Sequence, residues 1–160
     1  MKMNHFRAIQ AILGAARLAL FIAQPVTAGH GDESSTMNVG EDGLAIKGYD
    51  TVAYFTEGKA MVGSEDFQHV WREAKWNFTS AKHRAMFVAS PDKYAPQFGA
   101  FCALGVSKNA AVKADPEAWT IVDGKLYMNY SLEFRDKWRA DKEENIVKAN
   151  TAWAEHASAE

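Results

Sequence analysis

Apolar and polar residues alternate over two short stretches in the first half of the chain. The alternating apolar or aromatic positions are Phe67, His69 and Trp71, then Trp76 and Phe78. A period of two is typical of half-buried strands, so the pattern predicts a β-hairpin that turns near residues 73–74. A two-residue turn at that point sets Trp71 opposite Trp76. It also sets His69 opposite Phe78, on the same face.

A second hairpin is indicated by Asp123-Gly124, which lies between two apolar runs. Asp-Gly is a strong signal for a type I′ turn, because both central residues of that turn need positive φ. The turn predicts three cross-strand pairs, which are Val122 with Lys125, Ile121 with Leu126, and Trp119 with Met128. Four of these side chains are then expected on the core face: Trp119, Ile121, Leu126 and Met128.

Helical patterns occur in the middle of the chain and at its C-terminal end. Ser80 fits the N-cap of a helix that runs to about Ala89, where Ser90-Pro91 ends it. Ser131 fits the N-cap of an amphipathic helix, and residues 141–153 form a charged helix whose apolar stripe is Ile146, Ala149 and Trp153. Residues 51–55 are expected to form a short strand after a turn at 48–50. The predicted fold class is α+β: a small single domain with two antiparallel β-hairpins, a central helix and C-terminal helices.

Residues 1–28 have the pattern of a secretory signal peptide. Lys2 and Arg7 precede an apolar run, and small residues stand at the two positions that a signal peptidase reads, Val26 and Ala28. Arg17 interrupts the apolar run, and the alternative is a disordered or helical extension. We therefore expect a signal peptide at 1–28, a flexible lead at 29–43, a domain at 44–155, and a periplasmic or secreted protein.

Composition limits the function. The net charge is -2 and 24% of the residues are charged, with no concentrated basic stretch, so nucleic acid is not an expected partner. After the N-terminal segment, no run approaches the roughly 18 apolar residues of a membrane span. Cys102 is the only cysteine, so the chain has no internal disulfide. The expected partner is a metal ion or a small molecule, and a protein partner stays open.

Several blocks of the chain resemble the YHS domain family, in its exported branch. They read Gly-Tyr-Asp-Thr-Val-Ala-Tyr-Phe at 48–55, Trp-Asn-Phe-Thr-Ser at 76–80, Phe-Gly-Ala-Phe-Cys-Ala at 98–103, and Asp-Pro-Glu-Ala-Trp at 115–119. The resemblance covers roughly residues 44–153 and implies a small α+β fold. A distant branch, attached to heavy-metal pumps, is thought to bind metal through cysteines. The matching positions here are Ala53, Thr79 and His83, so that cysteine set is absent.

The residues that suit a soft metal ion are Cys102, His83, His69 and Met128. Thiolate and thioether donors favour copper(I), and imidazole binds either copper state or zinc. The resemblance and the lone thiol together predict an exported copper-binding or copper-handling accessory. No two of these donors have a metal-ligand spacing, and plain packing of each side chain is the alternative.

A second function remains open, in which aromatic side chains line a pocket for a small ligand or an envelope protein. Asp50 either faces such a pocket or caps its own turn. Enzyme activity is not expected, because the chain has no nucleophile elbow, zinc-protease motif or phosphate loop. A Cys102–His83 nucleophile pair is the one catalytic arrangement that the sequence leaves conceivable.

Overall fold

The structure is a computed structural model that describes residues 36–158, with side chains to residue 156. The predicted signal peptide at 1–28 lies outside the described residues. The described chain belongs to one compact unit, Gly31–Glu160. Its elements are η1 (Ile46–Gly48), α1 (Ala53–Thr56), β1 (Ser64–Trp71), β2 (Ala74–Phe78), α2 (Ala81–Ala89), α3 (Pro91–Tyr94), η2 (Phe98–Ala100), α4 (Ala103–Val106), β3 (Asp115–Val122), β4 (Lys125–Asn129), α5 (Leu132–Ala140) and α6 (Lys142–Ser158).

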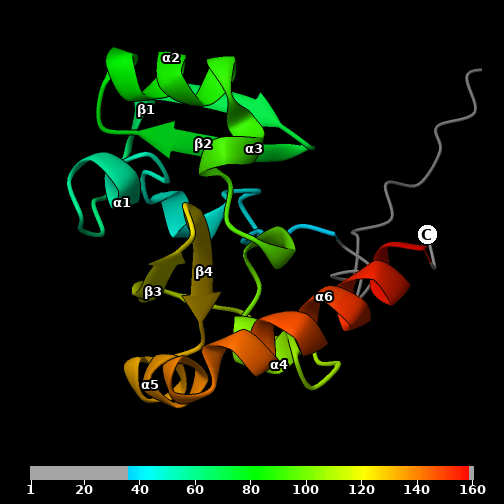
Figure 1. Cartoon of the computed structure of the whole chain (residues 1–160). Helices are drawn as coiled ribbons and strands as arrows, with labels where there is room; N and C mark the ends of the chain where they lie inside the picture. Colours follow the sequence, from blue (N-terminus) through cyan, green and yellow to red (C-terminus); the bar gives the residue numbers. More distant parts are fainter. Residues whose placement is uncertain (1–35, 159–160) are drawn as a thin grey trace, which may run out of the picture. The chain divides into compact units, whose positions relative to one another are not determined.

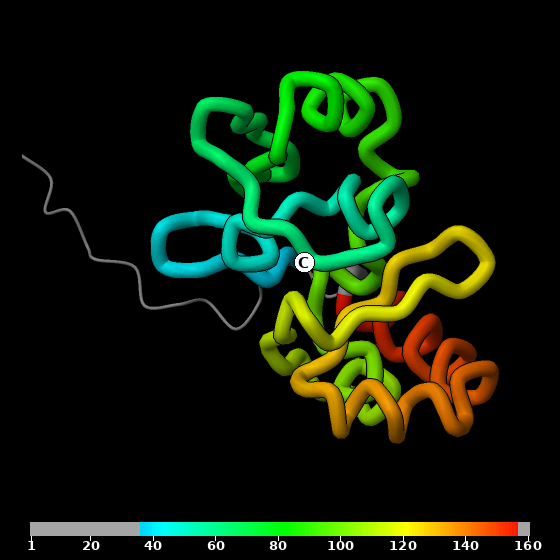
Figure 2. The backbone as a smooth tube through the Cα atoms, turned by 90° about the vertical axis from the view of Figure 1, so that its left-hand side faces the viewer, coloured from blue at the N-terminus to red at the C-terminus, as the bar shows by residue number. Residues whose placement is uncertain are grey.

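The fold class predicted from the sequence is confirmed. Strands β1 and β2 form one antiparallel sheet, and β3 and β4 form another. Helix α2 covers the first hairpin, while α4, α5 and α6 gather beside the second (Figure 1). The tube in Figure 2 shows the second hairpin (yellow) between the segment of the first hairpin and the C-terminal helices. No described helix is long and apolar enough to cross a membrane.

The first hairpin forms where expected, but its predicted register is wrong. Trp71 pairs with Ala74, and His69 pairs with Trp76. The turn residues are Arg72 and Glu73, both with positive φ (48° and 61°). The turn begins one residue earlier than predicted because Ala74 is fully buried and belongs to the strand. Each pairing moves by two positions on the partner strand, so the aromatic side chains keep their shared face.

The second hairpin matches the prediction in every pair. Trp119 pairs with Met128, Ile121 with Leu126, and Val122 with Lys125. Strand β4 is buried on both sides, because Leu126 and Met128 belong to one apolar cluster and Tyr127 to the other. It therefore contributes side chains to both parts of the core.

The turn of this hairpin gives a stability prediction. Asp123 and Gly124 have φ of 50° and 72°, as a type I′ turn requires. We expect Gly124→Val to lower the free energy of unfolding by about 1–3 kcal/mol, since a β-branched residue is strained at positive φ. Open space surrounds the position, with no heavy atom within 4 Å of an added Cβ, so the loss reports backbone strain and not a clash. Chemical denaturation measures it, and an unchanged midpoint would contradict the assigned turn.

The strand predicted at residues 51–55 is wrong, because the chain forms helix α1 there. Asp50 Oδ1 accepts hydrogen bonds from the backbone N–H of Val52 at 2.9 Å and of Ala53 at 3.3 Å. A side chain that accepts from the first N–H groups starts a helix. This local capping outweighs the β-propensity of the β-branched and aromatic residues that follow.

The other helix boundaries follow the sequence. Ser80 accepts from the N–H of His83 and caps α2. Ser131 caps α5 in the same way, through the N–H of Phe134. The apolar stripe predicted for the last helix packs in α6, where Ala149 is fully buried.

Part of the predicted flexible lead packs against the domain. Met37 is buried in the apolar cluster of the first hairpin. The backbone N–H of Asn38 donates to the carbonyl of Gly99 at 2.7 Å, and its side-chain amide donates to the carbonyl of Ala100 at 3.0 Å. These two hydrogen bonds attach the segment 36–38 to η2.

Tyr54 makes the stability of the fold sensitive to alkali. Burial raises the pKa of its phenol above the ordinary 10.0, and the nearby Glu117 carboxylate raises it further. Above pH 10 the unfolded chain loses this proton and the folded chain keeps it, so stability falls as pH rises above 10. We expect Tyr54→Phe to flatten that fall, at the cost of the hydrogen bond from Tyr54 to the carbonyl of Pro116. Denaturant titrations from pH 9 upward measure it, and equal slopes for both proteins would contradict it.

Candidate functional site

Cys102 is a fully buried residue whose thiol serves the local structure. It stands at the N-cap of α4, and its Sγ accepts from the N–H of Gly105 at 3.4 Å. The thiol also lies 3.8 Å from Oδ1 of Asn129. These contacts are those of a packed thiol that caps a short helix.

The structure distributes the four predicted metal ligands over different environments. Cys102 and Met128 are joined by a backbone bridge, but their side chains belong to different apolar clusters. The His69 ring packs against the edge of Phe87, with the ring centroids 6.4 Å apart. His83 binds Asp50. Within residues 36–158, no three or more His, Cys, Asp or Glu side chains form a group that could hold a metal ion.

The Asp50 carboxylate is the centre of a buried hydrogen-bond network. It is completely buried, and Oδ1 caps α1 as described above. Oδ2 accepts from the backbone N–H of Thr79 at 2.8 Å and from its hydroxyl at 2.7 Å. His83 Nδ1 lies 2.6 Å from the same oxygen. The network joins α1, the end of β2 and α2, so Asp50 acts as a structural anchor as well as a cap.

The network fixes the orientation of the His83 ring. Because a carboxylate only accepts, Nδ1 carries the proton that points to Asp50. Nε2 then faces the hydroxyl of Thr56, an exposed residue, at 3.3 Å. The sequence indicated the capping role of Asp50 but gave no sign of its contact with His83, 33 residues away.

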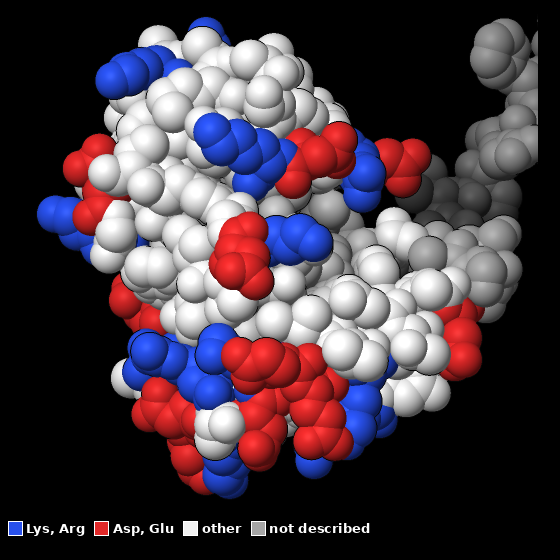
Figure 3. All heavy atoms as spheres, viewed as in Figure 1, with Lys and Arg blue, Asp and Glu red and all other residues white. Residues whose placement is uncertain are grey.

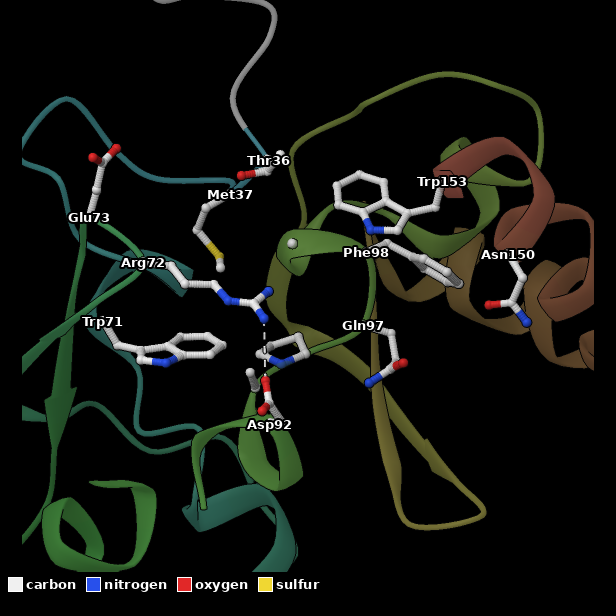
Figure 4. A pocket seen from close by; sticks show the side chains of 13 residues that line it. Thr36, Met37, Trp71, Arg72, Glu73, Asp92, Gln97, Phe98, Asn150 and Trp153 are labelled. Carbon is white, nitrogen blue, oxygen red and sulfur yellow. Dashed lines mark hydrogen bonds and ion pairs between the residues drawn. The ribbon is translucent and has the colours of Figure 1, made fainter. Parts of the chain in front are cut away.

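A cleft lies between the first hairpin, the α3–η2 loop and α6. We call it the tryptophan cleft, because Trp71 and Trp153 stand on opposite walls of it (Figure 4). Its volume is about 540 Å³. Its other lining residues are Thr36, Met37, Arg72, Glu73, Asp92, Ala95, Pro96, Gln97, Phe98, Gly99 and Asn150.

Arg72 lies in the middle of the tryptophan cleft. Its guanidinium carbon is 4.4 Å from the ring centroid of Trp71, and its Nη2 is 3.4 Å from Oδ1 of Asp92. Across the cleft, Trp153 packs against Phe98 with ring centroids 6.1 Å apart. The site therefore combines aromatic walls with a cation that a ring and a carboxylate hold in place.

The polar amides of the cleft have no internal partner. Gln97 and Asn150 point toward the cleft in Figure 4, and neither side-chain amide hydrogen-bonds to another residue of the described chain. Gln97 is held by its backbone, whose N–H donates to the carbonyl of Leu126 at 2.8 Å. Both amides are thus available to a bound molecule.

The sequence indicated some of these residues and not others. The alternation of β1 identified Trp71 as an aromatic face residue, and the stripe of α6 identified Trp153. Nothing in the sequence marked Arg72, because its place in the cleft depends on a turn that begins one residue earlier than predicted.

The surface charges do not form a large patch of one sign on the face drawn in Figure 3. Acidic and basic side chains are interspersed there. The chain matches no family model, and no curated protein or solved structure is significantly similar to it.

Proposed function

We propose that this chain is a binding protein for a small molecule, with the tryptophan cleft as its binding site. The observation that carries the proposal is the pair of tryptophans on opposite walls, together with the side-chain amides of Gln97 and Asn150 in the lining. Ligand pockets in proteins combine apolar and aromatic walls with a few polar groups that fix orientation. A volume of about 540 Å³ falls within the range of roughly 300–1,000 Å³ that such pockets have.

The walls of the cleft are supported from behind by the core. Trp71 packs edge-on against Phe87, with ring centroids 5.6 Å apart, and its carbonyl accepts from the indole N–H of Trp76. Trp153 packs against Phe98 and Phe101. Rigid aromatic walls lose little conformational entropy when a ligand binds, which favours affinity.

Binding is tested with small aromatic probes and tryptophan fluorescence. We expect Trp153→Ala to weaken the binding of such a probe by about two- to tenfold, since a stacking partner contributes about 0.5–1.5 kcal/mol. The matched control is Trp119→Phe, which alters a partly buried tryptophan outside the cleft. Thermal unfolding checks that both variants fold. Equal affinities for wild type and Trp153→Ala would contradict the proposed site.

Copper handling, the resemblance to the YHS family and export stay predictions. Titration of the reduced protein with copper(I) against a competing chelator tests the first, with Cys102→Ser as the comparison. The thiol is buried and caps α4. Equal, weak copper(I) binding by wild type and Cys102→Ser would mean that Cys102 is not a metal ligand.

Mass spectrometry of the native protein tests export, for which we expect a first residue at Gly29.

A further inference from the structure

We propose, on the basis of the proposed function, that the ligand of the tryptophan cleft carries a single carboxylate and that Arg72 binds it. A guanidinium presents five N–H donors in a rigid fork that matches a carboxylate. Of these donors, only Nη2 has a hydrogen-bond partner within the described residues, which is Asp92. The remaining donors can pair with a ligand.

Arg72 has contacts that orient its guanidinium toward the cleft without a ligand. One face of the guanidinium rests on the Trp71 ring at 4.4 Å, and the group stands in the middle of the cleft (Figure 4). Its side chain nevertheless keeps 63% of its surface exposed. A cationic side chain that is oriented but still accessible loses little conformational entropy when it binds an anion. The guanidinium is therefore preorganised for an anionic ligand.

The contact between Arg72 and Asp92 does not block this use. It is a single hydrogen bond of 3.4 Å between two exposed side chains, and the Asp92 side chain is 82% exposed. Exposed ion pairs of this kind contribute little. A ligand carboxylate can therefore share the guanidinium with Asp92 or replace it.

The charges of the lining limit the ligand to one negative charge. Among the described residues of the lining, Arg72 is the only basic one, whereas Asp92 and Glu73 are both acidic. A second negative charge on the ligand finds no further cation in the cleft and faces two carboxylates, which disfavours dicarboxylates and phosphate esters. The body of the ligand is expected to be apolar or aromatic, because Trp153 and Phe98 form the opposite wall.

The experiment compares phenylacetate with phenylacetamide, a neutral molecule of nearly the same shape, by NMR titration of the folded chain. We expect wild type to bind phenylacetate more tightly. We expect Arg72→Met to lower the affinity for phenylacetate by about fivefold, the upper end of what a partly exposed ion pair contributes. The affinity for phenylacetamide is expected to change less than about twofold, because that probe has no charge for the guanidinium to pair with.

Lys93 offers a matched control. Its ammonium also lies over an aromatic ring, 5.0 Å from the centroid of Tyr94, but Lys93 does not line the cleft. Lys93→Met removes the same charge and is expected to leave phenylacetate binding unchanged. An equal loss in both variants would mean that only net charge matters and would overturn the proposal.

Two further outcomes separate this inference from the proposed function. If phenylacetate and phenylacetamide bind the cleft equally, and Arg72→Met changes neither, the cleft is a binding site but the carboxylate assignment is wrong. If neither probe binds wild type at millimolar concentration, the proposed function fails and the carboxylate assignment fails with it.

Discussion

Replacing Asp50 by alanine is expected to lower the free energy of unfolding by about 3–5 kcal/mol, because several buried donors lose their acceptor at a cost of about 1–3 kcal/mol each. The carboxylate is completely buried and accepts from backbone or side-chain groups of Val52, Ala53, Thr79 and His83. Alanine leaves the N–H groups of Val52 and Thr79 and the Nδ1 of His83 without this acceptor, whereas the N–H of Ala53 keeps its bond to the backbone carbonyl of residue 50. Chemical denaturation of wild type and variant measures the difference.

Two control variants distinguish the loss of the Asp50 hydrogen-bond network from the loss of a negative charge alone. Asp50→Asn keeps the size and one acceptor oxygen, so we expect a smaller loss than for alanine. Asp66→Ala removes an exposed carboxylate of β1, and we expect a change within about 0.5 kcal/mol. A loss below about 1 kcal/mol for Asp50→Ala would be no more than one ordinary hydrogen bond and would contradict the anchoring role.

Phe87→Ala is expected to cost about 3–5 kcal/mol, because it truncates a large core side chain. The ring is completely buried. It contacts four aromatic rings, those of Trp71, Trp76, Phe78 and His69, at centroid distances of 5.6, 5.0, 5.2 and 6.4 Å. The cavity left by alanine lies directly behind Trp71, so this variant is also expected to loosen one wall of the tryptophan cleft.

The neighbouring residue of α2 provides the control. Val88 is 51% exposed, and Val88→Ala is expected to change stability by less than about 0.5 kcal/mol. The two variants are compared by their thermal and denaturant midpoints. Similar losses in both would show that α2 does not pack on the first hairpin through Phe87.

Local signals predicted those parts of the fold that depend on local chemistry. Asp123-Gly124 fixed the register of the second hairpin, since a type I′ turn allows one pairing. Ser80 and Ser131 marked the starts of α2 and α5 because their hydroxyls cap the first N–H groups. Where the turn signal was weak, at Arg72-Glu73, the pairing was displaced although the alternation of the strands was correct.

The parts that the sequence did not predict depend on contacts between distant residues. Asp50 reads as a turn residue, and its contact with His83 exists only once α2 lies against α1. The tryptophan cleft likewise joins residues of β1, α3, η2 and α6, with Trp71 and Trp153 far apart in the sequence. Aromatic periodicity placed both tryptophans on the apolar face of their elements. Periodicity does not distinguish a side chain that packs in the core from one that lines a cleft.

The most direct test of the binding site uses the five tryptophans of the chain as reporters. Each indole N–H gives its own NMR signal, and the signals are assigned with single Trp→Phe variants. On titration with phenylacetate, binding in the tryptophan cleft predicts the largest shifts at Trp71 and Trp153. The signal of Trp138, which is completely buried in the other cluster, is expected to stay unchanged. Shifts at Trp119 or Trp138 with none at Trp71 and Trp153, or no shift at any indole, would contradict it.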